Sequence, residues 1–327
     1  MKITMVGAGA WGTALAQGLH QGGHDIVLWG HDARHLEEMR LTGRNERYLP
    51  GIELPASWHY EPSLARAVGA SRVVVLAVPS KAVREISRHI SDYDGTLVSV
   101  TKGIEYETGL TMCGVLRQNV PGARWAALSG PSLAREVALG IPTAIVAASE
   151  DAGVAGQVQE WFHRPSFRVY TSTDLLGVEL GGALKNVVAI AAGVGDGLGF
   201  GDNSKAALIT RAMVEIRRLG VACGVRAETL AGLSGLGDLT VTCFSKLSRN
   251  RTFGERLGRG EQIEAILSGS VSIVEGYPTA RSAHQVSRKL NLDTPIIDEV
   301  YALLYEGKSP ALAVSDLTRR ESKSEGE

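Results

Sequence analysis

The sequence predicts an α/β protein in which a Rossmann-type domain with a mostly parallel sheet precedes an all-helical domain. Strand and helix signals alternate through the first half, and a glycine-rich turn follows the first strand. From about residue 174 onward, the apolar residues recur with helical spacing instead. We therefore divide the chain into an N-terminal domain, 1–173, and a helical domain, 174–327, as expected for 327 residues.

The individual elements follow from apolar runs bounded by Gly, Pro, Ser or Asp. Strands are predicted at 2–6, 25–29, 72–78, 95–100, 125–128 and 143–147, with helices at 10–21 and 80–90. In the second half, helices are predicted from 174 onward and at 205–223, 254–259, 279–290 and 295–305. The small residues of 234–240 predict a flexible loop, and the polar tail after Arg319 is expected to fray.

Composition narrows the functional class. A net charge of −1 gives no reason to expect nucleic acid or an anionic membrane as a partner. The chain enters an apolar run directly after Met1-Lys2, without the pattern of a signal peptide, and the apolar run 187–194 is too short to span a bilayer. Three widely spaced cysteines fit reduced thiols in the cytoplasm, and the sequence suggests no metal site. The ligands of this protein are therefore expected to be small molecules.

Residues 7–12 read GAGAWG, a G-x-G-x-x-G segment between a predicted strand and a predicted helix. In this context Gly7 permits the tight turn, Gly9 lets a pyrophosphate approach the backbone, and Gly12 allows close packing of helix and strand. The phosphates then lie over the free N–H groups of the helix that begins at Ala10. A glycine-rich turn without a ligand is the alternative, and the context favours dinucleotide binding.

Three residues after the second strand bear on the choice of dinucleotide. An acidic residue there would accept a hydrogen bond from the ribose of NAD, whereas a cation would suit the 2′-phosphate of NADP. Asp32 lies slightly beyond the strand, and His31 and Arg34 are near enough to meet a phosphate. All three could instead be solvated loop residues, so the choice stays open, with NADPH slightly favoured.

Three later strands end in residues that could contact a substrate, at 78–80, 101–103 and 129–132, because ligands bind at the carboxyl ends of strands in such sheets. Lys102 supplies a cation there for a phosphorylated or carboxylated substrate, although a surface lysine is an equal alternative. Residues 130–132, Gly-Pro-Ser, offer a second anion-binding helix start or a simple helix cap.

The long helix after residue 174 carries a lysine in apolar surroundings. Gly182, Lys185 and Asn186 share one face of this helix, and a glycine pair inside a helix points to close packing or ligand approach. Since a buried lysine needs a partner, Lys185 is a candidate proton donor and acceptor with a lowered pKa.

Farther along, Asp238 ends a small-residue segment, and residues 248–250 read Ser-Arg-Asn. A hydroxyl, a guanidinium and an amide in succession suit a phosphate, with a polar helix-capping loop as the alternative.

Together these motifs resemble bacterial NAD(P)-dependent glycerol-3-phosphate dehydrogenase. The resemblance runs in order through 7–12, Tyr48-Leu49-Pro50-Gly51, Thr101-Lys102-Gly103, 129–132, Leu184-Lys185-Asn186-Val187, 235–238 and 248–250. It covers the chain from Met1 to about Tyr305 and departs at two positions. Ala10 stands where the family often has serine or threonine, and His31 stands where arginine is frequent, which weakens inference about the coenzyme.

The resemblance implies reversible conversion of dihydroxyacetone phosphate to sn-glycerol 3-phosphate, which supplies glycerophospholipid synthesis. It implies that Lys185 transfers the proton and that the substrate is lined by Lys102, Gly130, Ser132, Lys185, Asp238, Ser248, Arg249 and Asn250. Beside Gly7, Gly9, Ala10 and Gly12, it implies that the cofactor contacts Trp11, His31, Tyr48, Lys102, Ala134, Arg249, Ile273 and Glu275.

Two other functions compete with this interpretation. A related two-domain dehydrogenase acting on a 3-hydroxy acid or a sugar acid would also use Lys185 and Asn186. A non-enzymatic NAD(P)H sensor would need the glycine segment but neither Lys185 nor Arg249. A homodimer is expected on base rates alone.

Overall fold

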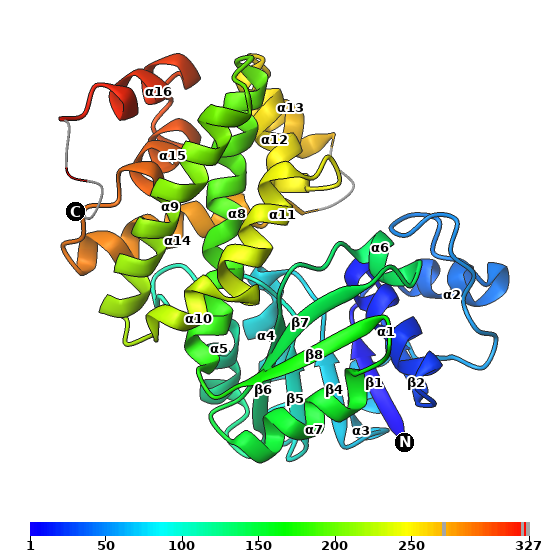
Figure 1. The fold of residues 1–327 in the computed structure, drawn as a ribbon. Coiled ribbons are helices and arrows are strands. Elements are labelled where there is room, and N and C mark those ends of the chain that lie inside the picture. Colours follow the sequence, from blue (N-terminus) through cyan, green and yellow to red (C-terminus); the bar gives the residue numbers. More distant parts are fainter. Residues whose placement is uncertain (270–272, 322–323, 325–327) are drawn as a thin grey trace.

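The computed structural model describes residues 1–269, 273–321 and 324 (Figure 1). The first half of the chain forms an eight-stranded sheet in the order β3-β2-β1-β4-β5-β6-β7-β8. Its elements are β1 (Lys2–Val6), α1 (Ala10–Gln21), β2 (Asp25–Trp29), α2 (Ala33–Thr42), β3 (His59–Tyr60), α3 (Leu64–Gly69), β4 (Val73–Leu76), a 3₁₀ turn (Ser80–Ala82), α4 (Val83–Arg88), β5 (Thr96–Ser99), α5 (Met112–Asn119), β6 (Arg124–Ser129), α6 (Ala134–Ala138), β7 (Thr143–Ala148), α7 (Ala152–Phe162) and β8 (Phe167–Ser172).

Strand register brings the ligand-binding loops to one edge of the sheet. Strands β2, β1, β4, β5 and β6 are parallel, and Val6 at the end of β1 pairs with both Trp29 and Leu76. The strand order reverses between β1 and β4, the position where open α/β sheets bind their ligands. The loops after these strands therefore meet at one carboxyl edge.

Both faces of the sheet are covered, which is why its strands read as continuous apolar runs. Side chains of α1 and α7, such as Leu15 and Phe162, pack with Ile3 and Met5 of β1 on one face. Helices α3, α4 and α5 pack on the other face, where Leu116 joins a separate apolar cluster. This confirms the predicted α/β domain with a mostly parallel sheet.

Two strands were missed by the sequence analysis, and the last two strands, β7 and β8, run against the others. Strand β3 has two residues, too few for a periodic signal, whereas β8 alternates buried and exposed side chains at the sheet edge, as a half-buried strand does. Strand β7 is antiparallel to β6 because the connection with α6, a helix of five residues, stays at the carboxyl edge.

The second half of the chain is helical, as predicted. It contains α8 (Leu175–Gly197), α9 (Asp202–Ala222), α10 (Ala227–Ala231), a π turn (Leu233–Gly237), α11 (Asp238–Phe244), α12 (Arg249–Gly258), α13 (Ile263–Ser268), α14 (Gly276–Lys289), α15 (Pro295–Tyr305) and α16 (Pro310–Thr318).

Helix α8 is the centre of this half. Its side chains enter three apolar clusters: one with α9 and α11 around Leu184, one with α12 around Val187, and one with β6 and β7 around Val178. The sequence analysis gave only 187–194 as an apolar run, but the whole helix of 23 residues is long and apolar enough to cross a membrane. However, 89% of the apolar 18-residue stretch within this helix is buried inside the structure, as in the core helix of a folded domain.

Two predictions in this half were wrong. The helix expected at 254–259 begins at Arg249, because the Ser248 hydroxyl accepts a hydrogen bond from Arg251 N and caps it. Segment 234–240, expected to be a flexible loop, is instead the π turn and the start of α11. Its Gly235 packs so closely on α10 that a Cβ would lie 1.9 Å from Leu230 O.

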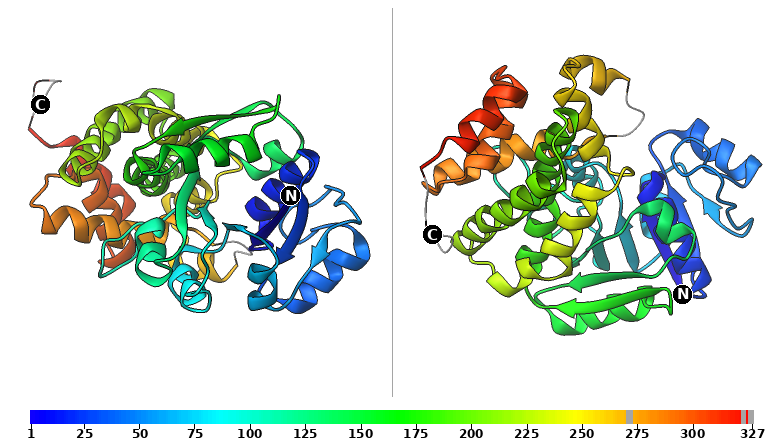
Figure 2. Two further views of the ribbon diagram at one scale, coloured as in Figure 1. Left: turned by 90° about the horizontal axis from the view of Figure 1, so that it is seen from below. Right: turned by 45° about the horizontal axis from the view of Figure 1, so that its top comes forward.

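The helices of the second half gather on one side of the molecule and the strands of the first half on the other (Figure 2). In Figure 1, α8 extends down to the sheet, where it packs against β6 and β7. The carboxyl edge of the sheet thus faces the start of the helical half, where the two halves form one site.

Candidate active site

A buried lysine on α8 forms the centre of the site. Lys185 Nζ donates hydrogen bonds to Asp238 Oδ1 and to Thr242 Oγ1, each at 2.7 Å. Asp238 and Thr242 both lie on α11, one helical turn apart, and are 1% and 4% exposed. The ammonium is therefore fixed in position by two partners and shielded from bulk water.

Asp238 also joins the helical half to the sheet. Its Oδ2 accepts a hydrogen bond at 2.5 Å from Nζ of Lys102, which follows β5. Lys102 donates in addition to Gly130 O at 3.3 Å, and Ser132 Oγ donates to the same carbonyl at 2.8 Å. Five residues that the sequence analysis assigned to the substrate are thus brought together.

The environment of Lys185 suits proton transfer near neutral pH. Burial lowers the pKa of Lys185 to about 8; Asp238 opposes this shift by attraction, while Lys102 adds to it by repulsion. A group with this pKa exchanges its proton readily between pH 7 and 9, which is what a general acid and base requires.

Glycines explain how α8 approaches the rest of the site so closely. A Cβ on Gly182 would lie 2.5 Å from Ser129 Oγ at the end of β6, so the lack of a side chain at Gly182 lets α8 approach this strand closely. One Cβ on Gly193 would lie 2.0 Å from Arg251 O, and one on Gly254 would lie 2.0 Å from Ile190 O. Helices α8 and α12 therefore pack backbone to backbone, which fixes the start of α12 beside Lys185.

Gly254→Ala tests this packing. We expect the free energy of unfolding to fall by about 1–3 kcal/mol, the usual cost of overpacking, because the added methyl meets a rigid helix backbone. Gly156→Ala in α7 is the control: a Cβ there meets no atom within 4 Å, and alanine favours helix by about 1 kcal/mol. Urea unfolding of both variants measures the difference, and equal stabilities would contradict the close packing.

The start of α12 carries the predicted phosphate-binding residues. Ser248 is the N-cap, Arg249 is the first helical residue, and Asn250 faces α8. Asn250 Nδ2 donates to Asn186 Oδ1 at 2.8 Å, while its Oδ1 accepts from Gly276 N at 2.8 Å. Asn250 therefore ties α12 to α8 and α14 through both ends of its side-chain amide.

Arg249 lies at the first turn of α12. Its side chain remains accessible to solvent, yet the surrounding protein lowers the pKa of its guanidinium, and attraction by Glu275 opposes the shift. Glu275 in turn accepts hydrogen bonds from the backbone N–H and the hydroxyl of Ser80, at 3.0 and 2.6 Å. Glu275, which like Arg249 is predicted to contact the cofactor, is thus bound to the segment after β4.

The glycine loop fits a dinucleotide. Gly7 has φ +127° and a Cβ there would lie 2.3 Å from Ala77 O, so no other residue fits. A Cβ on Gly12 would lie 2.0 Å from Gly7 O, whereas Gly9 has open space beside it. Within the described chain no side chain caps α1, which leaves N–H groups of its first turn to bind phosphates.

The other predicted cofactor residues spread along the carboxyl edge. Ala10 and Trp11 begin α1, and Ala134 begins α6, which packs on α1. His31 is exposed after β2, and Ile273 precedes α14. His31 and Lys102 follow strands three positions apart in the sheet, roughly 14 Å at ordinary strand spacing, so the predicted residues span a long ligand.

Two residues with direct contacts in the site were missed. Thr242 holds Lys185, and its only sequence signal is its position one turn after Asp238. The buried side chain of Asn45 donates to Ala8 O at 3.0 Å and to Thr13 Oγ1 at 2.8 Å, which braces the glycine loop. Tyr48 packs edge-on against His35 at 5.3 Å beside this brace.

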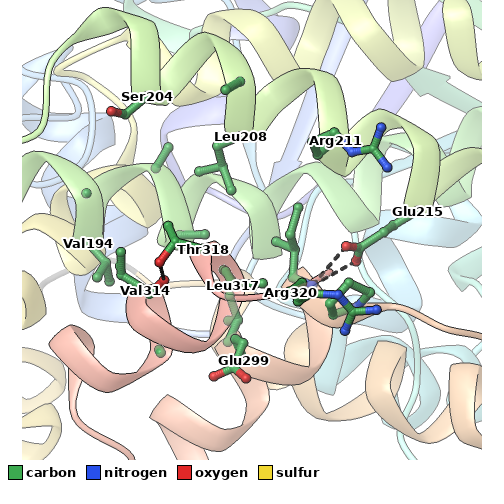
Figure 3. A pocket seen from close by; sticks show the side chains of 18 of the residues that line it. Val194, Ser204, Leu208, Arg211, Glu215, Glu299, Val314, Leu317, Thr318 and Arg320 are labelled. Carbon is green, nitrogen blue, oxygen red and sulfur yellow. Dashed lines mark hydrogen bonds between the residues drawn. The ribbon is translucent and has the colours of Figure 1, made fainter. Parts of the chain in front are cut away.

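A further cavity of the described chain lies elsewhere, between the far end of α8 and helices α9, α15 and α16 (Figure 3). It measures about 700 Å³ and contains Glu215, whose carboxylate accepts hydrogen bonds from Ile296 N and Ile297 N. Burial raises the pKa of Glu215 to about 7. None of the predicted site residues lines this cavity, so it is separate from the Lys185 site.

Nothing in the described residues brings three or more His, Cys, Asp and Glu side chains together as metal ligands.

A model of the NAD-dependent glycerol-3-phosphate dehydrogenase N-terminus matches residues 2–155, and one of the C-terminus matches 174–315. This chain belongs to that family. The family assignment made from the sequence is thereby confirmed, and with it the class of NAD(P)-dependent oxidoreductase.

Curated members of the family align over nearly the whole chain. Glycerol-3-phosphate dehydrogenase (NAD(P)+) of Syntrophotalea carbinolica is 47% identical and covers 99% of both chains. The relative of the same name from Anaeromyxobacter sp. strain K is 48% identical, covering 99% of this chain and 100% of that one. The crystal structure of glycerol-3-phosphate dehydrogenase from Coxiella burnetii superposes with a TM-score of 0.94 at 37% identity, covering 98% and 99%.

Proposed function

We propose that this protein catalyses the reversible, NAD(P)H-dependent reduction of dihydroxyacetone phosphate to sn-glycerol 3-phosphate. The observation that carries the proposal is the buried Lys185 ammonium, held by Asp238 at the carboxyl edge of a dinucleotide-binding sheet. The names of the curated relatives support the same substrate and coenzyme class.

The reaction assigns a role to each group around Lys185. When bound, the reduced nicotinamide supplies a hydride to the C2 ketone. Negative charge then develops on the ketone oxygen, where the Lys185 ammonium stabilises it and donates the proton. In the reverse direction, neutral Lys185 accepts the proton of the C2 hydroxyl. Asp238 keeps the ammonium oriented, and Lys102 adds positive charge at the edge of the sheet.

Arg249 is proposed to hold the substrate phosphate, because guanidinium groups bind phosphates through paired hydrogen bonds. Arg249→Gln should raise KM for dihydroxyacetone phosphate by about 10- to 100-fold, the effect of losing a charge-assisted contact. The control is Arg259→Gln, because Arg259 lies directly after the same helix and pairs with Glu255 on the surface. Steady-state kinetics with varied substrate measure the change. An unchanged KM in Arg249→Gln would contradict this role.

We keep a slight preference for NADPH as part of the proposal. His31 and Arg34 are both exposed after β2, where the adenosine end of a dinucleotide binds in this fold. Positive groups at that position suit the 2′-phosphate.

The division between the two domains is proposed to fall between residues 173 and 174. Strand β8 ends at Ser172, and Asp174 caps α8 by accepting a hydrogen bond from Gly177 N at 3.0 Å. Residues 1–173 would bind the dinucleotide, and residues 174–327 would supply Lys185, Asp238 and Arg249.

The cellular setting is proposed from the burial of α8 and the state of the cysteines. Burial of the long apolar helix α8 supports a soluble protein without stable membrane insertion, and the free cysteines support a reducing compartment, the cytoplasm. A homodimer is the expected assembly for such an enzyme. The product would supply glycerophospholipid synthesis.

The deciding experiment is oxidation of NADH and NADPH, assayed separately, by the purified protein with dihydroxyacetone phosphate. Saturable turnover is the expected result, and the ratio of kcat/KM values gives the coenzyme preference. Turnover with a 3-hydroxy acid or sugar acid pair instead would favour a related dehydrogenase. Cofactor binding without reduction of any ketone would favour a non-enzymatic sensor.

A further inference from the structure

The acidic residue that would be expected to select NAD already has hydrogen-bond and ion-pair partners within this protein. Asp32 Oδ1 accepts hydrogen bonds from Arg34 N and His35 N, each at 3.1 Å, and so caps helix α2. Its second oxygen, Oδ2, lies 3.2 Å from a guanidinium nitrogen of Arg47. Both oxygens thus have partners within the protein, and the ion pair with Arg47 engages the carboxylate that would otherwise accept a hydrogen bond from the ribose of NAD.

Arg47 reaches this position from the segment between α2 and β3. Its guanidinium lies over the ring of Tyr48, 5.1 Å from the centroid, and its side chain is 49% exposed. Because a guanidinium has five N–H donors and one contacts Asp32, Arg47 keeps donors for a second anion.

Basic side chains also lie beside Asp32. Arg34 is the second residue of α2, and His31 is exposed just before this helix. The start of α2 adds the positive end of the helix dipole. With Arg47 in place, the surroundings of Asp32 suit a doubly charged phosphate better than a neutral hydroxyl.

We infer that Arg47 determines the coenzyme preference of this protein by two linked effects. Its guanidinium binds the 2′-phosphate of NADPH, and its ion pair with Asp32 withholds that carboxylate from the ribose of NADH. The inference rests on the proposed use of a nicotinamide cofactor, but it concerns the binding of the adenosine end alone.

Loss of Arg47 should change the affinities for the two coenzymes in opposite directions. In Arg47→Gln the 2′-phosphate loses a charged partner and gains the uncompensated repulsion of Asp32. The released Oδ2 can then accept a hydrogen bond from a ribose hydroxyl. If Arg47 only supported the loop, its replacement would weaken the binding of both coenzymes alike.

Calorimetric titration of the full-length protein with adenosine 2′,5′-bisphosphate and with adenosine 5′-monophosphate tests this without turnover. In Arg47→Gln the Kd for the bisphosphate should rise by about 10-fold or more, the value of one charge-assisted contact, while that for the monophosphate stays unchanged or falls. Arg44→Gln is the control, because Arg44 lies in the same segment and pairs with Glu53 on the surface.

A second variant separates the two effects. Asp32→Ser keeps a helix-capping side chain but removes the carboxylate, so added to Arg47→Gln it should restore part of the bisphosphate affinity. Equal weakening of both nucleotides in Arg47→Gln, or no change in either, would overturn the inference. The dihydroxyacetone phosphate assay can fail without altering these affinities, so the two proposals are tested independently.

Discussion

Lys185→Ala should lower kcat for reduction of dihydroxyacetone phosphate by about 10³-fold, within the range that general acids contribute. The variant removes both the proton donor and the positive charge that meets the developing alkoxide. No other side chain replaces it in the described structure, because the Lys102 ammonium is engaged by Asp238 and Gly130 O. Stopped-flow or steady-state NADPH oxidation measures the loss.

The fold and the dinucleotide site should survive this change. Asp238 retains Lys102 as a partner, and the glycine loop does not contact Lys185 in any hydrogen bond of the described residues. NADPH affinity is therefore expected to stay near that of the unmodified protein, which fluorescence titration can establish. Lys185→Met keeps the unbranched stem and guards against a packing defect, and Lys289→Ala on the surface of α14 is the neutral control. A preserved kcat in Lys185→Met would remove Lys185 from the mechanism.

Local patterns were enough to predict much of the fold. The first strand, the turn at Gly7 and the helix from Ala10 were located because each has a short-range signal in periodicity or glycine spacing. The same holds for α8, whose predicted start at Asp174 coincides with an observed N-cap. Strand β8 shows that even a clear alternation is overlooked when half of its side chains are polar.

The contacts within the site were harder to predict, because they join residues distant in sequence. Lys102 and Asp238 are 136 positions apart, and Asn45 and Ala8 are 37 apart, so no local pattern links them. The glycine pair in α8 did indicate close approach, but its partner Ser129 belongs to the other half of the chain. Ser248 was a local signal for the start of a helix, but the sequence analysis placed the start of this helix five residues too late.

Asp238→Asn should shift the pH dependence of catalysis as well as its rate. Reduction needs the Lys185 ammonium, so kcat/KM for dihydroxyacetone phosphate should fall as pH rises through the pKa of Lys185, about 8. Asp238 favours the ammonium by attraction, so its removal leaves burial and the repulsion of Lys102 unopposed and lowers that pKa further. The descending limb should therefore move to lower pH, and activity at pH 7.5 should drop by about 10²-fold.

The oxidation of sn-glycerol 3-phosphate supplies the complementary test, since it needs neutral Lys185. Its ascending limb should move to lower pH in Asp238→Asn, in parallel with the reduction profile. Thr242→Val is the matched comparison, because it removes the other hydrogen bond to Lys185 and leaves the charge of Asp238 intact. A large shift in Asp238→Asn with a small one in Thr242→Val would assign the tuning of Lys185 to charge. Equal shifts would assign it to hydrogen bonding, and unshifted profiles in both variants would mean that a group other than Lys185 titrates.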